Sequence, residues 1–220
     1  IISRTEKEAK EHAILQNLDT SFQKIDELPF DFERRRMSVI VKDDSNVVSM
    51  VTKGALEEML NISTHVEYRG EVIPLTEDIR QEVLAEVGQL NRQGLRVLGV
   101  GYKSGLREDY AYAVTDESDM ILTGYLAFLD PPKPSAAPAI QALLEHGVRT
   151  KILTGDNEKV TQAICEKVGL DVEHILLGAD IDQMTDQELA DVVEKVTVFA
   201  KLSPDQKARI ILQLKRNGHG

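Results

Sequence analysis

The chain has 220 residues, 42% hydrophobic and 29% charged, which is typical of a folded protein with one large domain or two smaller ones. Its net charge of −11 argues against the clustered basic surface that nucleic acid requires, so we expect no nucleic-acid partner. No run approaches the roughly 20 apolar residues of a membrane helix. The only cysteine, Cys165, allows no disulfide within the chain. We interpret it as a small buried hydrophobe rather than a reactive thiol.

The first half of the chain predicts hairpins, two longer helices and a returning strand. A run without Pro or Gly predicts a helix at residues 5–18. Strands rich in β-type residues are expected at 21–28, 37–41 and 47–52, with the turn residues Asp43-Asp44-Ser45-Asn46 before the third. There follow a short helix at 54–60, a small hairpin at 66–73, a capped helix at 76–93 and an apolar strand at 95–102. This set predicts an α+β unit with an antiparallel sheet.

The pattern changes near residue 120, where strands begin to alternate with helices. Strands are expected at 122–129, 148–153, 174–177 and 196–200, and helices at 135–146, 157–168, 185–193 and 204–216. Such alternation indicates βαβ units and a parallel sheet. A polar stretch between Asp109 and Met120 separates the two patterns. We therefore expect one domain over 1–118 and a second over 119–220.

The corner Thr154-Gly155-Asp156-Asn157 is the most informative motif of the chain. It follows an apolar run and opens an expected helix. The free N–H groups of a helix start and the Thr154 hydroxyl can all point at one phosphate. Asp156 beside that phosphate would need a cation between the two anions. A strand–turn–helix corner with a structural role alone remains the alternative.

The stretch Lys201-Leu202-Ser203-Pro204-Asp205-Gln206-Lys207 opens the last expected helix. Ser203 is a favourable N-cap, and proline is favourable at the first helical position. Lys207 lies one turn into the helix and can supply the positive charge that Asp156 and a phosphate need. Taken alone, the stretch is typical of a well-capped amphipathic helix, which stays open as an interpretation.

Phe30 is the candidate for contact with a nucleobase in the first half. It follows Pro29 at a strand end, and the chain has only five phenylalanines and no tryptophan. Stacking of a base on an aromatic ring contributes about 1–3 kcal/mol. From the residues alone, however, packing of Phe30 in the core is the favoured interpretation.

Three positions could bring positive charge to the phosphates of a nucleotide. Arg35 belongs to the run Glu33–Arg36, which is typical of a solvated loop. Lys53 precedes Gly54, which lets the backbone approach a ligand closely. Arg96 is a lone charge in an apolar strand, so it faces either solvent or a phosphate.

With Asp130-Pro131-Pro132, these motifs resemble those of the P-type cation-transporting ATPases. Six motifs follow that family's order between about residues 28 and 216: Phe30-x4-Arg35, Lys53-Gly54-Ala55, Gly94-Leu95-Arg96, DPP, TGDN and KLSPDQK. The wording LPFDFERRRMSV and KGALEEML is most similar to the bacterial magnesium-transporting branch.

The resemblance implies a fold and a set of roles. It implies an α/β protein with an antiparallel-sheet nucleotide-binding domain over 1–118. Residues 119–220 would be the C-terminal part of a haloacid-dehalogenase-like, Rossmann-type phosphorylation domain. The residues implied around the nucleotide are Phe30, Arg35, Lys53, Gly54 and Arg96, and those at the phosphoryl group are Thr154, Gly155, Asp156 and Lys207. Arg35 departs from the lysine of most members, and Leu56 from the usual proline.

The resemblance also implies ATP and Mg²⁺ as cofactors. The family's phosphorylated aspartate lies in a DKTGT motif and its Mg²⁺ site in a GDGxND motif, and this sequence contains neither. We assign no metal ligand here. The chain is expected to bind ATP without catalysing a reaction. Its partners in the parent pump would be membrane helices and an actuator domain, at the cytosolic face of the cell membrane.

Two alternatives stay open. A stand-alone haloacid-dehalogenase-like phosphatase would use residues 1–118 as a cap and would need a nucleophilic aspartate of its own. A non-catalytic interaction module would bind no nucleotide at all.

Overall fold

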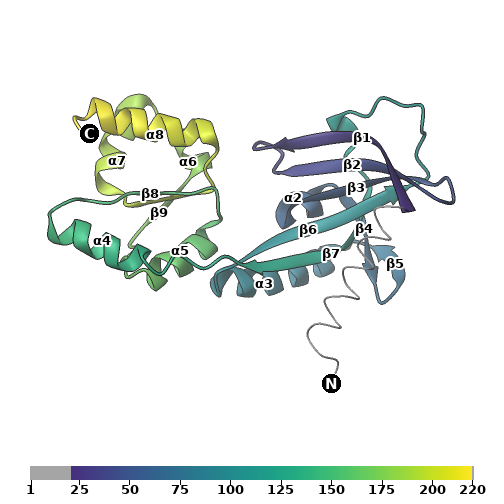
Figure 1. The fold of residues 1–220 in the computed structure, drawn as a ribbon, viewed down its shortest axis with the longest axis horizontal. Coiled ribbons are helices and arrows are strands. Elements are labelled where there is room, and N and C mark those ends of the chain that lie inside the picture. Colours follow the sequence, from purple (N-terminus) through teal and green to yellow (C-terminus); the bar gives the residue numbers. More distant parts are fainter. Residues whose placement is uncertain (1–20, 220) are drawn as a thin grey trace, which may run out of the picture. The chain divides into compact units, whose positions relative to one another are not determined.

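The computed structural model describes residues 21–219 (Figure 1). By their contacts these residues divide into two compact units. One holds the described residues up to Arg80 together with Leu98–Leu126, and the other holds Gln81–Val97 and the chain from Ala127 onward. The helix expected at residues 5–18 lies outside the described residues.

The larger sheet has seven strands in the order β1-β2-β3-β6-β7-β4-β5. Their bounds are β1 (Phe22–Asp31), β2 (Arg36–Asp43), β3 (Val48–Ala55), β4 (Ser63–Tyr68), β5 (Glu71–Pro74), β6 (Leu95–Ser104) and β7 (Met120–Leu129). Strands β1, β2, β3 and β6 pair antiparallel in succession, as do β4 and β5, whereas β7 runs parallel to β4. The mostly antiparallel sheet expected for the first half is confirmed.

Two elements of this part of the chain, β7 and the helix after β3, differ from what the sequence predicted. The strand expected to open the parallel sheet, β7, instead joins the seven-stranded sheet, where Met120 pairs with Ser63 and donates its N–H to the carbonyl of Ile62 at 2.9 Å. The short helix α2 (Leu56–Asn61) begins two residues later than expected. Gly54 and Ala55 stay in β3 because they pair with β6.

One face of this sheet is buried beneath α2. Along β3, residues alternate between buried and open, as a half-buried strand should. The buried side carries Met50 and Thr52, and Met59 of α2 lies so close to β6 that a Cβ on Gly99 would stand 3.0 Å from its Cβ. The opposite side of β3, with Val51 and Lys53, is exposed. The fold therefore leaves one face of β3 available to a ligand.

The connections of the first half carry two further helical elements. Helix α3 (Glu77–Arg92) follows Thr76, whose hydroxyl accepts a hydrogen bond from the N–H of Ile79 at 3.4 Å. Gly94, in the left-handed backbone region, follows the helix. A short 3₁₀ turn, η1 (Val114–Asp116), was not expected and precedes β7.

The smaller sheet has three parallel strands in the order β8-β10-β9. They are β8 (Ile152–Leu153), β9 (Ile175–Leu177) and β10 (Val198–Ala200). In Figure 1, one face is covered by α4 (Ala136–Glu145) and α5 (Glu158–Lys167). The other face is covered by α6 (Gly178–Asp182), α7 (Asp186–Lys195) and α8 (Pro204–Arg216). The parallel sheet expected from the alternation is confirmed.

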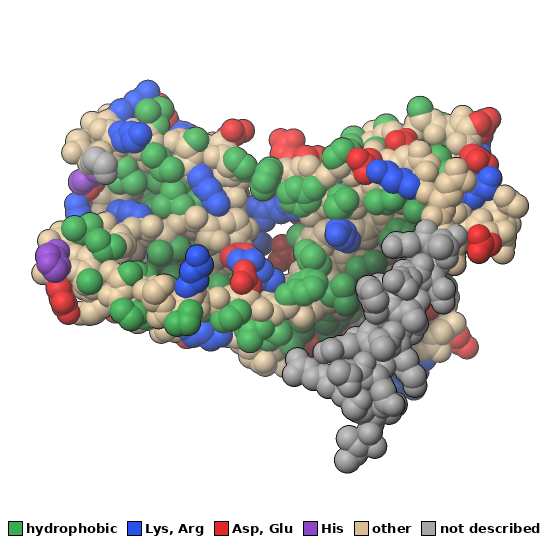
Figure 2. Space-filling model, viewed as in Figure 1, with side chains coloured by type: hydrophobic (Ala, Val, Ile, Leu, Met, Phe, Trp, Pro, Cys, Tyr) green, Lys and Arg blue, Asp and Glu red, His purple; other side chains and the backbone are tan. Residues whose placement is uncertain are grey.

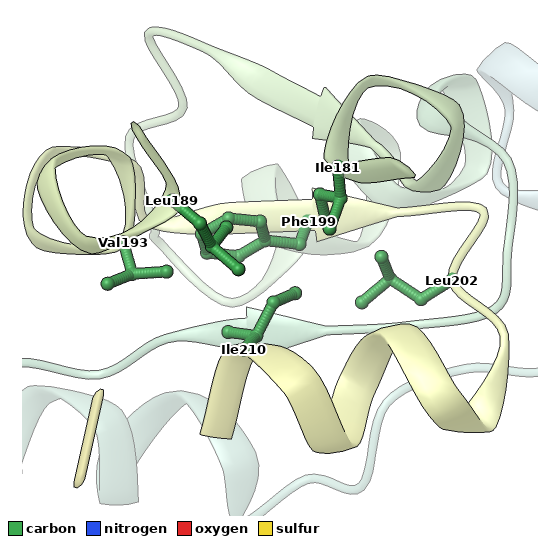
Figure 3. Packing of buried hydrophobic residues seen from close by; sticks show 6 residues of the cluster. All are labelled: Ile181, Leu189, Val193, Phe199, Leu202 and Ile210. Carbon is green, nitrogen blue, oxygen red and sulfur yellow. The ribbon is translucent and has the colours of Figure 1, made fainter. Parts of the chain in front are cut away.

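A hydrophobic core lies on each face of the smaller sheet, and β10 contributes a side chain to both. Val198 packs with Cys165 on the side of α4 and α5, whereas Phe199 packs with the helices of the other side. Figure 3 shows the Phe199 ring among side chains of α6, α7 and α8 and of the segment that leads into α8: Ile181, Leu189, Val193, Ile210 and, before α8, Leu202. Successive strand residues point to opposite faces, so two neighbours can serve two cores. Burial also raises the pKa of the Cys165 thiol, which supports the interpretation of this residue as a small buried hydrophobe.

Two details of this half differ from expectation. Strand β8 has two residues rather than six, because the segment before it returns from α4, with the N–H of Val148 bonded to the carbonyl of Leu143 at 2.9 Å. Helix α6 was not expected. It is only five residues long, so its sequence holds little periodicity.

Candidate functional site

A β-bulge determines which way Phe30 faces. Leu28 pairs with Ser38, but the next pair is Asp31 with Arg36, so β1 has one residue more than β2 over this interval. An extra residue reverses the alternation of side chains beyond it. Leu28 is buried on the covered face, and without the bulge Phe30 would follow it there. With the bulge, Phe30 is 48% exposed.

The register of the neighbouring strands shows what shares the open face with Phe30. The two residues of the bulge, Pro29 and Phe30, lie opposite Met37 of β2. Met37 pairs with Lys53 of β3, and Lys53 pairs with Val100 of β6. Paired residues point to the same face of a sheet. An aromatic ring, an ammonium group and apolar side chains therefore lie in one row across four strands. The core position that sequence reasoning favoured for Phe30 is wrong.

The turn between β1 and β2 brings the chain close to Gly54. The Arg35 backbone is in the left-handed region, with φ of 49°, and its carbonyl accepts a hydrogen bond from the N–H of Ala55 at 3.0 Å. A Cβ on Gly54 would stand 2.4 Å from the Cβ of Arg36 and 2.7 Å from the carbonyl oxygen of Arg35. Glycine is thus required at position 54 because the next strand is so close. The expectation that Gly54 also lets the backbone approach a ligand remains a prediction.

The buried carboxylate of Glu117 anchors this turn through hydrogen bonds to Arg34 and Arg36. Glu117 is 3% exposed, and its two oxygens lie 2.6 and 2.7 Å from Nη1 of Arg34. It also accepts hydrogen bonds from Nε of Arg36 and from the hydroxyl of Ser38, both at 2.7 Å. Burial by itself raises the pKa of Glu117, but these donors outweigh it and hold the pKa below its usual value.

Sequence reasoning missed Glu117. It lies in a polar run that is typical of a loop, more than 80 residues from either arginine. The run Glu33–Arg36, interpreted as a solvated loop, is in fact anchored: the guanidinium groups of Arg34 and Arg36 both bond to the buried carboxylate. The signal that could have revealed the pairing is the placement of Arg34 and Arg36 shortly before and at the first residue of a largely apolar strand.

Arg96 lies in the second unit by its contacts, and there it meets two carboxylates. Its Nη1 is 2.8 Å from an oxygen of Asp130, and its Nε and Nη2 are each 2.9 Å from oxygens of Asp156. The structure thus brings together Arg96 and Asp156, which the sequence had assigned to different groups. The sequence left solvent and phosphate as the two possible neighbours of the Arg96 side chain. In the structure its partners are instead acidic side chains of the DPP and TGDN motifs.

The TGDN corner lies at the carboxyl ends of β8 and β10. The Thr154 hydroxyl donates to Oδ2 of Asp156 at 3.0 Å and accepts the N–H of Asp156 at 3.1 Å, so the two side chains hold each other. Asn157 caps α5 by accepting the N–H of Val160 at 2.9 Å. Ligands of parallel α/β sheets bind at this edge.

The start of α8 lies beside the same corner. The N–H of Leu202 bonds to the carbonyl of Thr154 at 3.0 Å, and the N–H of Lys201 bonds to the carbonyl of Asp156 at 2.7 Å. Ser203 caps α8, with its hydroxyl accepting the N–H of Gln206 at 3.2 Å. Lys207 is half-buried in the first turn. The two motifs of the second half are therefore neighbours in space.

The residues present do not form a complete magnesium site. Within residues 21–219 no three carboxylate, histidine or cysteine side chains are grouped closely enough to hold a metal ion. The Asp156 carboxylate is already bonded to Arg96 and Thr154. We therefore assign no Mg²⁺ ligand among these side chains.

Comparison with known proteins identifies the family. The family described as "P-type ATPase, cytoplasmic domain N" matches residues 6–135. The chain belongs to the P-type ATPases. The resemblance drawn from its motifs is confirmed. In the part of the chain described by the structure, none of the helices of this P-type ATPase segment is long and apolar enough to cross a membrane.

The similar proteins are longer than this chain. The chain is 48% identical over 212 residues to "Magnesium-transporting ATPase, P-type 1" of Salmonella typhimurium LT2, covering 96% of the chain and 24% of that relative. It is 47% identical over 204 residues to the protein of the same name from Escherichia coli K12, covering 93% and 23%. It is 32% identical over 208 residues to "Calcium-transporting ATPase 1" of Bacillus cereus, covering 92% and 23%. The chain thus spans about a quarter of these relatives.

Proposed function

We propose that this chain is the ATP-binding segment of a cation-pumping P-type ATPase, and that the transported ion is Mg²⁺. The higher identity to relatives named magnesium-transporting, 48% against 32% for a calcium-transporting one, supports the choice of ion. The parent protein would act at the cytosolic face of a membrane, with membrane helices and an actuator domain as partners.

ATP binds on the open face of the seven-stranded sheet in this proposal. The observation that carries it is the bulge between Leu28 and Asp31, which aims an aromatic ring away from the core and into the row that holds Lys53. The base stacks on Phe30. Lys53 and Arg35 supply the positive charge that an acidic chain must gather locally to hold phosphates. Gly54 allows β3, which carries Lys53, to lie close to Arg35 and Arg36.

The second unit acts on the phosphoryl group. Thr154, Gly155 and Asp156 line its site, and Lys207 contributes charge from the first turn of α8. Phosphoryl transfer needs mainly positioning and compensation of charge. The proposed acceptor is the aspartate of the family's DKTGT motif, which this sequence does not contain. The family resemblance assigns Arg96 to the nucleotide, and in this structure its guanidinium group is paired with Asp130 and Asp156.

The proposed domain assignment follows from these roles. Residues 1–118 form the nucleotide-binding domain, and residues 119–220 form part of a haloacid-dehalogenase-like phosphorylation domain. At the start of the second span, β7 pairs with β4 in the seven-stranded sheet of the first unit. The parallel three-stranded sheet with helices on both faces supports the second assignment.

Calorimetric titration with ATP tests the proposal. The chain should bind ATP, and Phe30→Ala should weaken binding by about 1–3 kcal/mol. Phe22→Ala is the matched control, because Phe22 lies on the same strand and is similarly exposed. Equal affinities for the two variants would refute the assignment of Phe30. The absence of any nucleotide binding would favour an interaction module instead.

A second assay separates the pump segment from a phosphatase. Incubated with labelled ATP or a phosphate ester, the chain should form no acid-stable phosphoenzyme and release no phosphate above background. Turnover that disappears in Asp156→Asn would favour the stand-alone phosphatase.

A further inference from the structure

Phe32 is an aromatic residue to which nothing above gives a role. Its ring lies beside that of Phe30, with centroids 5.2 Å apart and planes at 87°. Phe32 is 57% exposed, so both rings present much of their surface to solvent. The two half-exposed phenyl rings are in contact with each other and form a small apolar patch on the surface.

The segment that carries Phe32 is held in place independently of any ligand. The Asp31 carboxylate accepts the N–H of Arg34 at 2.7 Å and also pairs with its guanidinium group. The same guanidinium donates to the carbonyl of Pro29 at 2.6 Å and to buried Glu117. Phe32 lies between these anchored residues. A ring presented by a rigid turn loses little conformational entropy when it binds.

The perpendicular arrangement suits a flat aromatic ligand. A base that lies parallel to one ring meets the other ring edge-on, and both offset stacking and edge-to-face contact are favourable for aromatic pairs. A cation lies nearby, since Lys53 shares the row across the open face with Phe30. A ligand with a flat base and an anionic tail matches both features.

We infer that Phe32 is the second wall of the base site, and that Phe30 and Phe32 together grip the adenine of ATP. This inference rests on the proposed function. Phe32 contacts the base rather than the phosphates, so its ring should contribute to the affinity for adenosine and ATP alike and not to that for inorganic polyphosphate.

Competition binding tests the inference. The affinities for ATP, adenosine and tripolyphosphate are measured for the unaltered chain and for Phe32→Ala, Phe32→Leu and Phe32→Tyr. Loss of the ring in the Ala and Leu variants should weaken ATP and adenosine about fivefold or more, and leave tripolyphosphate within about twofold. The Tyr variant keeps a ring and should bind ATP like the unaltered chain. Phe22→Leu is the control for loss of an exposed ring elsewhere on β1.

The outcomes separate the two proposals. If the unaltered chain binds ATP and Phe30→Ala weakens it, but Phe32→Leu binds ATP and adenosine normally, the second wall is refuted and the proposed function stands. If Phe32→Leu weakens tripolyphosphate as strongly as ATP, the residue does not act through the base and the inference is also refuted. If the unaltered chain binds no ATP, both fail together. Leucine at position 32 keeps apolar volume on an exposed turn, so the variant remains informative if Phe32→Ala does not fold.

Discussion

Removal of the Glu117 carboxylate should strongly destabilise the first unit, because this buried group pairs with two arginines. The carboxylate is buried, and the side chains of its partners Arg34 and Arg36 are only 15% and 13% exposed. Glu117→Ala leaves both guanidinium groups without their shared anion. Loss of one member of a buried pair costs about 3–5 kcal/mol, because the remaining charge is left uncompensated. We expect a loss in that range in the free energy of unfolding of this unit.

The measurement is urea unfolding followed by circular dichroism, together with hydrogen exchange of the β2 and β3 amides. Exchange assigns the loss to the first unit, since the β2 and β3 amides belong to that unit. Glu108→Ala is the matched control: Glu108 is also paired to a strand cation, Lys42 at 2.9 Å, but is 55% exposed, so its loss should cost less than about 1 kcal/mol. If the two variants lose equal stability, the buried network does not anchor the turn and the reasoning fails.

Three further predictions concern the same framework. The pKa of Glu117 is lowered in the folded state from its usual 4.5, so its contribution to stability is fully present above that pH and disappears as the pH falls through the folded pKa. When the free energy of unfolding is measured against pH in the acid range, the part of its decrease that comes from Glu117 should be absent in Glu117→Gln. Gly54→Ala should lower the free energy of unfolding of the first unit by about 1–3 kcal/mol and weaken ATP binding, because the added Cβ would displace β2 from β3. Calorimetry measures both, and unchanged stability together with unchanged ATP affinity would contradict this prediction. Ser203→Ala should cost about 1 kcal/mol through the lost cap of α8, measured by thermal unfolding, and an unchanged midpoint would contradict it.

Local signals predicted most of the helices. The capping residues Asn157, Thr185 and Ser203 each bond to an N–H three residues ahead, so the sequence near a helix start carries the information. Alternation of strand and helix likewise predicted the parallel sheet. The corner at Thr154 and the start of α8 were recognised as separate motifs, and their adjacency follows from the neighbouring ends of β8 and β10.

Features that depend on pairing over long distances could not be predicted. The apolar run of β7 was recognised as a strand, but its place beside β4 depends on a partner more than 50 residues away. The bulge in β1 exists only relative to β2, so no local pattern in β1 reveals that Phe30 faces outward. Glu117 looks like a loop residue until the arginines of the first turn are brought to it.

The exposed side chains of one face are mixed in type. On the face presented in Figure 2, cationic and anionic side chains are interspersed with hydrophobic ones rather than gathered into a basic stripe. A nucleotide needs only a few convergent cations, whereas a nucleic acid needs an extended positive surface.

The central claim is that ATP binds on the open face of the seven-stranded sheet, and an amide NMR titration of the labelled chain with ATP tests it most directly. The account predicts saturable shift changes concentrated at the bulge of β1, the Arg35 turn and the Lys53 end of β3, with the tip of the β2–β3 hairpin at residues 44–47 unaffected as an internal reference. Changes confined to other surfaces, or none at saturating ATP in a folded chain, would contradict it.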